Sequence, residues 1–313
     1  MSVEMGAMLD ALRGVRWPAR RPVAAGLPGA HRSRQRGTSG EFTEYRLYRQ
    51  GDDPRRLDWK LLARSNRAFV RLTDDRALEP TWIVADASAS LAYPLQETDG
   101  RPTKWDLLRA VAIGLAAVAH AGADPVGLLV ASGNGARLVP RTRRGTVREV
   151  SRALYETRCV GSSAMAPLLA PLSPNCRLVV LSDLLGDFEE TLRVVSQLIA
   201  SGAQVDCVHV VAVEELELPD GAFLAIDPDD ESRAPRASHR GARTEYRRAF
   251  DAFRAEAARR WRAAGAGYLE ARTDAAPARV VRHIVCGAAG EMHGDAALNV
   301  RQSAGQSLTE RRA

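Results

Sequence analysis

The sequence predicts a doubly wound α/β domain with a mostly parallel sheet. Three largely apolar runs, at residues 82–85, 177–181 and 204–213, have the hydrophobicity of strands that are buried on both faces, although the third contains Asp206 and His209. Segments with helical periodicity separate these runs and are long enough to cross over a sheet. Because such crossovers return each strand parallel to the one before it, we expect a single sheet with helices on both faces, over residues 79–279.

The composition is that of an ordinary soluble globular protein. Of the 313 residues, 45% are hydrophobic and 26% are charged, and 44 basic residues against 38 acidic ones give a net charge of +6. Almost all of the basic residues are arginines, since Lys60 and Lys104 are the only lysines. Genome composition explains an excess of arginine in an alanine-rich chain as well as a ligand does. The positive charge alone therefore does not indicate a nucleic-acid-binding protein.

The cysteines and the apolar segments point to a soluble protein of a reducing compartment. Cys159, Cys176, Cys207 and Cys286 are far apart and form no Cys-x-x-Cys pair, so they suggest neither a zinc site nor a disulfide framework. Arginines interrupt the N-terminal segment where a signal peptide would be apolar. The longest apolar run, residues 110–123, is shorter than the roughly 20 residues that span a bilayer. We therefore expect a cytoplasmic protein.

Two segments precede the predicted domain, and the first is basic. Residues 1–39 form an arm in which Met5, Met8 and Leu12 indicate one short amphipathic helix. An arginine cluster follows at 31–37. Such a cluster is typical of a solvated arm, and it would also suit docking to an acidic surface or to nucleic acid.

Residues 40–78 form a block of alternating charges that contains a helix and a strand. Asp53 is predicted to cap the helix, and Pro54 to occupy its first position. The strand covers residues 69–73 and leads into the first buried strand. Local salt bridges explain the alternating charges as well as a binding surface does, so both interpretations stay open at this point.

The elements of the domain follow one another with recognisable boundaries. Thr103 caps a largely apolar helix, and a turn at 132–135 joins two strands of a hairpin. His209 lies inside an apolar run and is expected to be a core histidine rather than a ligand. The pattern degrades after residue 279, so 280–313 is predicted to be a disordered tail. After the first strand we expect helix 103–122, strands 126–131 and 136–140, helices 146–156 and 164–172, strand 177–181, helix 189–201, strand 204–213, a short β segment at 216–227, helix 245–264 and strand 267–273.

Polar side chains follow the first buried strand at alternate positions. Asp86, Ser88 and Ser90 place one carboxylate and two hydroxyls just past its carboxyl end, which is the edge of an open α/β sheet where ligands bind. Oxygen ligands of this kind suit Mg²⁺ or Mn²⁺ and do not suit zinc or copper. A turn of small residues, with a serine that caps the next helix, would give the same pattern.

Two more polar segments are predicted at the same edge. Another buried strand ends in Ser182-Asp183, and the loop at 161–163 carries two further serines. Together the three loops offer up to five oxygens to a cation that prefers six, so a water or the carboxylate of a partner protein can complete its shell. No histidine and no second acid stands close to Asp86 in the sequence to act as a general base, which favours binding over catalysis.

These residues resemble two known groups of proteins. Asp86, Ser88 and Ser90, followed by Ser162 and Asp183, resemble the metal-ion-dependent adhesion site of von Willebrand factor A domains. More narrowly, the chain resembles the bacterial domain-of-unknown-function-58 family. The resemblance covers residues 31–273 and is carried by residues 40–64, with Gly-Asp-Asp-Pro-Arg-Arg-Leu-Asp-Trp-Lys at 51–60, by the Asp-Ala-Ser-Ala-Ser run at 86–90, and by Leu-Ser-Asp at 181–183.

The resemblance implies a fold, a metal, a partner and a set of ligands. The fold would be the Rossmann-like sheet of von Willebrand factor A domains, and the metal would be Mg²⁺ or Mn²⁺. The implied partner is a MoxR-type AAA+ ATPase. Many members of the family carry transmembrane helices that this sequence does not show, so a soluble form is expected. Many A domains have a threonine in the middle loop, where Ser162 is the best match here and Ser163 the alternative, so the implied ligands are Asp86, Ser88, Ser90, Ser162 and Asp183.

Two other functions fit parts of the sequence. A metal-dependent phosphotransferase or phosphatase would use Asp86 as its nucleophile, but such enzymes usually carry Asp-x-Asp and serine replaces the second acid here. A nucleic-acid-binding protein would use Arg32, Arg34, Arg36 and the basic run 141–144, but no aromatic residues interleave with them for stacking on bases. We therefore favour a non-enzymatic, metal-dependent protein-interaction module.

Overall fold

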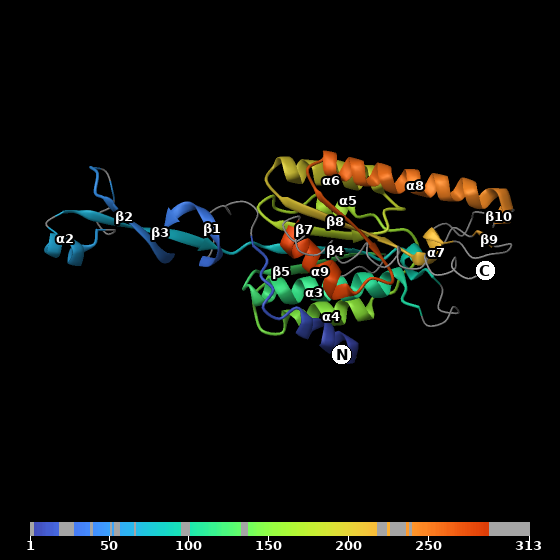
Figure 1. Ribbon diagram of the computed structural model, residues 1–313, viewed down its shortest axis with the longest axis horizontal. Helices are drawn as coiled ribbons and strands as arrows, with labels where there is room; N and C mark the ends of the chain where they lie inside the picture. The colour runs from blue at the N-terminus through green and yellow to red at the C-terminus, as the bar shows by residue number, and fades with distance from the viewer. Residues whose placement is uncertain are drawn as a thin grey trace, which may run out of the picture.

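The structure is a computed structural model that describes most of the chain as two sheets with their helices. Figure 1 shows an α/β domain and a slender three-stranded sheet that projects from one end of it. Among the helices that the structure describes, none has both the length and the apolar character needed to cross a membrane. The described residues are 3–18, 28–37, 40–50, 52, 57–65, 67–94, 101–132, 137–217, 224–225, 236–237 and 240–287.

The central sheet confirms the predicted fold class. Neighbouring strands are parallel throughout, except that the edge strand β6 pairs antiparallel with β5 as the return strand of the predicted hairpin. β4, the strand that ends in Asp86, lies inside the sheet between β5 and β7. The strand order is β11-β8-β7-β4-β5-β6, with β4 at Thr81–Asp86, β5 at Val126–Ala131, β6 at Arg137–Arg141, β7 at Arg177–Ser182, β8 at Gln204–Val211 and β11 at Gly267–Arg272.

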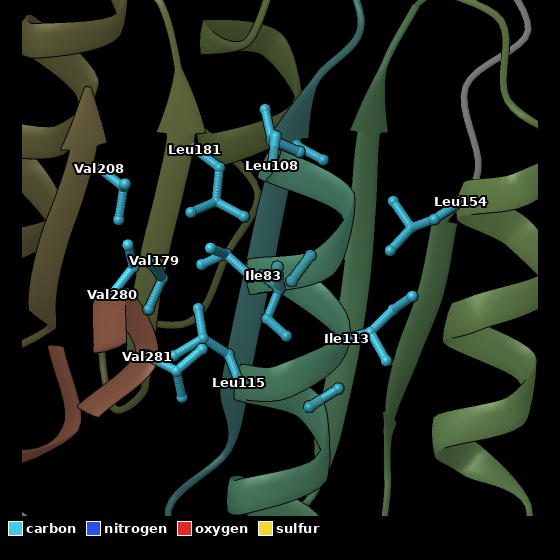
Figure 2. Packing of buried hydrophobic residues seen from close by; sticks show 14 of the residues in the cluster. Ile83, Leu108, Ile113, Leu115, Leu154, Val179, Leu181, Val208, Val280 and Val281 are labelled. Atoms are coloured by element: carbon cyan, nitrogen blue, oxygen red, sulfur yellow. The ribbon is translucent and has the colours of Figure 1, made fainter. Parts of the chain in front are cut away.

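Helices cover both faces of this sheet, and each face has its own hydrophobic core. On one face, Ile83 of β4 and Leu181 of β7 pack against Leu115 of α3 and Val281 of α9 (Figure 2). Alternate residues of the same strands, such as Val84, enter the core of the other face, as expected for strands that are buried on both sides. The first face is covered by α1 (Val3–Ala11), α3 (Lys104–Ala121), α4 (Thr146–Glu156) and α9 (Pro277–Cys286), and the second by α5 (Ala166–Leu169), α6 (Phe188–Ala200) and α8 (Arg240–Ala263).

The start of α3 is fixed by a capping box. The Thr103 hydroxyl accepts a hydrogen bond from the Asp106 amide at 3.1 Å, and the Asp106 carboxylate accepts one from the Thr103 amide at 3.0 Å. The predicted cap is therefore confirmed, and it makes Lys104 the first residue of the helix. This position becomes important at the candidate site.

The predicted disordered tail is wrong at its beginning. Residues 277–286 form α9, which places Val280, Val281, Ile284 and Val285 in the core against α3 and α1. The apolar run is short and follows a proline, so the sequence suggested only a fragment, whereas helical spacing gathers its valines on one buried face. The rest of the tail, residues 288–313, lies outside the described residues.

The N-terminal arm also contributes to the domain. The predicted short helix exists as α1, and its Met5 and Met8 are buried together with Leu12 and Trp17 in the core beside α3. The arginine cluster predicted as a solvated arm lies in strand β1, Pro28–Gly37. The first part of the chain is therefore a helix packed on the domain, followed by a strand of the second sheet.

The charged block forms most of this second sheet. β3 (Phe69–Ala77) lies between β1 and β2 (Gly40–Leu47) and is antiparallel to both. The helix of the block, α2 (Trp59–Ser65), begins later than predicted, because the Asp58 carboxylate accepts the Leu61 amide at 2.9 Å. The predicted cap Asp53 and the following Pro54 lie outside the described residues.

Two short elements complete the connections between strands. α7 (Val213–Leu216) follows β8 directly, in a segment that the sequence did not predict to be helical. The predicted short β segment at 216–227 is represented by β9 (Leu224–Ala225), which pairs with β10 (Arg236–Ala237).

Candidate metal site

The candidate site lies at the carboxyl edge of the central sheet, where three loops meet. The first loop follows β4, and the second contains residues 159–163. Backbone hydrogen bonds join these two, from the Ala89 amide to the Gly161 carbonyl at 2.8 Å and from the Val160 amide to the Ala87 carbonyl at 3.2 Å. The third loop follows β7, the strand that pairs with β4. Strand order thus brings together segments that are far apart in the chain.

Asp86 stands at the centre of the site and is almost completely buried, with 1% of its surface exposed. One carboxylate oxygen accepts hydrogen bonds from the Ser88 amide at 2.9 Å and from the Ser163 hydroxyl at 2.5 Å. The other accepts the Ser182 hydroxyl at 2.6 Å. The hydroxyls of Ser88 and Ser90 lie 3.0 Å apart, and both are buried. The alternation predicted for this loop therefore does gather its oxygens in one place.

The middle loop contributes Ser163 and not Ser162. Ser163 is buried and donates to Asp86, whereas Ser162 is exposed. The preceding Gly161 has a positive φ of 58°, so the chain turns sharply just before the two serines. Residue types alone did not reveal which serine faces inward after this turn. The preference for Ser162 is therefore corrected to Ser163, the alternative that the sequence had left open.

Asp183 is buried on the third loop and is held by a residue that the sequence analysis missed. One of its oxygens accepts the Leu185 amide at 3.3 Å, and the other lies 2.7 Å from the Lys104 ammonium. Lys104 also donates to Glu215 of α7 at 2.9 Å. The sequence did contain a signal for this residue. A lysine at the first position of a buried helix is unusual, because the helix dipole disfavours a cation there, and it therefore indicates nearby acids.

The electrostatics of the site favour a further positive charge. Burial raises the pKa of Asp86, and the nearby charge of Asp183 raises it further. Burial lowers the pKa of Lys104, but Asp183 and Glu215 more than offset this and raise it overall, so its ammonium stays charged. The cluster contains three acids and one ammonium, and its formal charge is −2 when all of them are ionised: Asp86, Asp183, Glu215 and Lys104. One divalent cation would compensate this charge.

The donor set fits a hard cation. In the parts of the chain that the structure describes, no group of three or more His, Cys, Asp or Glu side chains could hold a metal ion. A cation at this edge would therefore take part of its coordination from serine hydroxyls, which suits Mg²⁺ or Mn²⁺. The residues that could hold it are Asp86, Ser88, Ser90, Ser163 and Asp183.

His209 of β8 does not take part in this set. Its Nδ1 lies 2.5 Å from the Tyr268 hydroxyl, and its ring packs edge-on against the ring of Phe253. Burial lowers the pKa of His209 to about 4. The prediction of a satisfied core histidine is confirmed.

The strand order and the polar carboxyl edge define a doubly wound α/β domain with a candidate ligand site at the end of its parallel strands. The model of the family described as "Protein of unknown function DUF58" matches residues 44–258, and the chain belongs to this family. Uncharacterized proteins of Mycobacterium tuberculosis and Mycobacterium bovis are 32% identical to it over 277 residues, which cover 84% of this chain and 84% of each relative. The family model thus covers residues 44–78 of the charged block as well as most of the α/β domain.

Several solved structures match at low similarity. An aerotolerance-related membrane protein from Bacteroides fragilis is 16% identical, with a TM-score of 0.41 over 66% of this chain and 98% of its own. The protein BatB from Bacteroides thetaiotaomicron is 13% identical, with a TM-score of 0.42 over 66% and 96%. The manganese-loaded TRAP protein from Plasmodium vivax is 13% identical, with a TM-score of 0.33 over 42% and 56%.

Proposed function

We propose that this protein is a non-enzymatic protein-interaction module whose site binds Mg²⁺ or Mn²⁺. The observation that supports this most is the buried cluster in which Asp86, Ser88, Ser90 and Asp183 gather carboxylate and hydroxyl oxygens around excess negative charge. Hard oxygen ligands and uncompensated carboxylates are what a magnesium ion prefers. With five oxygens from the chain, a sixth position remains for a water or for a carboxylate of the partner.

The surface around the cluster supports a protein as the partner. Val160 of the second loop is 56% exposed and Leu185 of the third is 46% exposed. Apolar side chains on two of the three loops could pack against a partner whose acidic residue reaches the metal. We propose a MoxR-type AAA+ ATPase in the cytoplasm as this partner, on the ground of the family resemblance.

The first test is a calorimetric titration with Mg²⁺. Wild-type protein is expected to show saturable binding, and Asp86→Ala is expected to lose it while it keeps a cooperative thermal transition. The loss follows because Asp86 organises the hydroxyls of Ser163 and Ser182 as well as supplying charge. Equal binding by both proteins would contradict the assigned site. Absence of binding by either protein at millimolar Mg²⁺ would contradict the proposal that the chain's own oxygens suffice to bind the ion without a partner.

The two serines of the middle loop provide a matched pair of variants. Ser163→Ala removes the hydroxyl that faces Asp86, and it is expected to weaken Mg²⁺ binding about tenfold or more. Ser162→Ala removes an exposed hydroxyl one residue away and is expected to bind like the wild type. The opposite order would show that the loop rearranges around the ion to present Ser162.

The partner is tested by a pull-down with a purified MoxR-type ATPase from the same organism. Binding is expected in Mg²⁺, and it should be lost in EDTA and with Asp86→Ala. Retention in EDTA would show that the interaction does not use the site. In that case the exposed residues of the second sheet would be the better candidates for the contact.

The alternative of a phosphotransferase has less support from the geometry. A nucleophilic aspartate must reach its substrate, whereas Asp86 is buried and accepts three hydrogen bonds. Lys104 is held in its protonated form, so it does not serve as a general base. A phosphatase assay of wild type against Asp86→Asn checks this, and Mg²⁺-dependent turnover lost in the variant would favour the enzyme.

A further inference from the structure

Lys104 is a buried cation beside the proposed metal site. It is one of only two lysines among 44 basic residues, and its side chain is 1% exposed. Its ammonium nitrogen lies 2.7 Å from Asp183 Oδ2 and 2.9 Å from Glu215 Oε1. The two acids belong to different elements, the loop after β7 and helix α7, so one side chain links three segments of the chain.

The helix itself does not explain a lysine at this position. The N-terminus of a helix favours anions, and a buried ammonium is unfavourable unless acids compensate it. In a chain this rich in arginine, a compact ammonium suits the position because it can direct separate N–H groups at two carboxylates. The presence of a lysine at position 104 is therefore explained by its contacts with Asp183 and Glu215 and not by the needs of helix α3.

We propose that Lys104 competes with a divalent cation for the negative charge of Asp183 and thereby sets the metal affinity of the site. This inference rests on the proposed function and specifies how that same site is regulated. A metal ion bound to Asp183 would share the carboxylate with the ammonium, and the two positive charges would repel each other at short range. Glu215 moderates the competition, because it draws the ammonium toward α7 and offsets its charge.

Glu215 is held in place by a hydrogen bond to the backbone, which limits how far it can move with Lys104. Its second oxygen accepts the Ala212 amide at 2.8 Å at the start of α7. The acid is thus anchored to the backbone that follows β8, and it cannot follow the ammonium freely toward the metal. A partner that moves α7 would change how strongly Lys104 holds Asp183, and hence how strongly the site holds its cation.

The test is a Mg²⁺ titration by calorimetry of three full-length proteins, with thermal melts at each metal concentration. Lys104→Met keeps the length of the side chain and removes its charge, and it is expected to bind Mg²⁺ at least tenfold more tightly than the wild type. Its melting temperature should be lower without metal and should rise more on addition of Mg²⁺. A residue that only supported the fold would give weaker binding when removed, so unchanged or weaker affinity would overturn the inference.

Glu215→Gln is the matched variant with the opposite expectation. Glutamine keeps an oxygen for the Ala212 amide, but it leaves the Lys104 charge to Asp183 alone, so Mg²⁺ binding should weaken several-fold. An equal or tighter affinity would also overturn the inference, and this variant gives the answer if Lys104→Met does not fold. Absence of binding in all three proteins would refute the metal site and the inference together. Binding by the wild type, without these two opposite shifts, would refute the inference alone.

Discussion

At the residue scale, the two ends of the central sheet carry buried charges that are balanced differently. At the amino end, Arg177 forms ion pairs with Glu79 and Asp124, and its guanidinium stacks 4.3 Å above the ring of Trp17. At the carboxyl end, the acids around Asp86 exceed the single ammonium. Around Arg177 two acids face one cation, which leaves a formal charge of −1, whereas three acids and one ammonium at the carboxyl end leave a formal charge of −2. The larger excess of negative charge lies where we propose the metal site, and we expect the Arg177 cluster to act mainly on stability.

Replacing Arg177 tests the structural half of this contrast. Arg177→Met is expected to lower the free energy of unfolding by about 3–5 kcal/mol, because two buried carboxylates would lose the cation that faces them. Urea denaturation measures the change. Arg259→Ala, which removes an exposed partner of Glu256, should leave the unfolding midpoint close to that of the wild type. Similar effects of the two substitutions would contradict the assignment.

His209 makes stability depend on pH in a defined direction. Burial holds its pKa at about 4 in the folded protein, against an ordinary value of 6.5 in the unfolded chain. Between pH 6.5 and pH 4 the imidazole therefore binds a proton in the unfolded chain but stays neutral in the folded protein. The free energy of unfolding thus decreases as the pH falls through this range, by about 3 kcal/mol in all.

The measurement is urea denaturation between pH 7 and pH 4 for wild type and His209→Gln. Glutamine can still bond to the Tyr268 hydroxyl but does not titrate, so the stability of the variant should fall less steeply with decreasing pH. Other acids contribute equally to both proteins, and the difference between the two curves isolates His209. Parallel curves would show that the imidazole is not held neutral by burial.

Sequence reasoning reached those site residues that lie at strand ends. Asp86, Ser88 and Asp183 follow apolar strands directly, and parallel pairing then brings the ends of β4 and β7 together. Lys104 is 79 residues from Asp183, and only the packing of α3 brings its ammonium to that carboxylate. Ser163 depended on the path of a loop. The sequence therefore reveals the candidate site residues that regular structure positions, and it does not reveal those that only tertiary packing brings to the site.

At the element scale, α9 is held by an unusually close approach to α3. A Cβ atom added to Gly114 of α3 would lie 2.8 Å from Val281 Cγ2 of α9 and 3.1 Å from Leu12 Cδ1. Glycine inside a helix otherwise costs about 1 kcal/mol relative to alanine. Its presence in the middle of α3 is therefore explained by the packing of α9, a helix that the sequence analysis placed in the disordered tail.

The contact between α3 and α9 predicts that substitutions of Gly114 and Val281 have coupled effects on stability. Gly114→Ala should destabilise the protein by about 1 kcal/mol, because overpacking outweighs the gain in helix propensity. In the background of Val281→Ala the same substitution should cost less, since the methyl group that it meets is gone. A double-mutant cycle by urea denaturation measures this coupling. A stabilising effect of Gly114→Ala in the wild type would show that α9 does not pack here.

Strands that are buried on both faces of the sheet were the easiest elements to predict, because their apolar runs distinguish them from amphipathic helices and from loops. The runs that became β4, β7 and β8 are largely apolar, as a central position in a parallel sheet requires, although β8 also contains Asp206 and His209. α2 and α9 are short, and their limits depend on a capping side chain or on a neighbouring helix, which periodicity does not reveal. Prediction therefore failed at α9 and at the start of α2, whose limits depend on contacts beyond their own periodicity, whereas α1 and β3 were predicted.

At the scale of the whole molecule, the second sheet has the character of an added interaction surface. Its strands pair among themselves, and among the residues whose side chains are described, none between 28 and 77 belongs to the two hydrophobic cores of the α/β domain. Large apolar side chains are exposed here, including Leu47 of β2 at 54% and Trp59 of the neighbouring helix α2 at 65%. The family match covers α2, β3 and the end of β2, and an exposed tryptophan in this part favours contact with a partner over a role in the stability of the domain.

This division predicts that the α/β domain folds and binds metal without the second sheet. A variant in which a short Gly/Ser linker replaces residues 19–77 is feasible, because the Trp17 carbonyl and the Glu79 carboxylate, one residue away from each end to be joined, both contact the guanidinium of Arg177. It is expected to unfold cooperatively and to bind Mg²⁺ with wild-type affinity, and Asp86→Ala in the shortened chain should abolish that binding. Calorimetry and thermal melts measure both properties. Loss of the cooperative transition would show that the second sheet is part of the folding unit, whereas a folded variant that no longer binds the ATPase partner would assign the docking contact to this sheet.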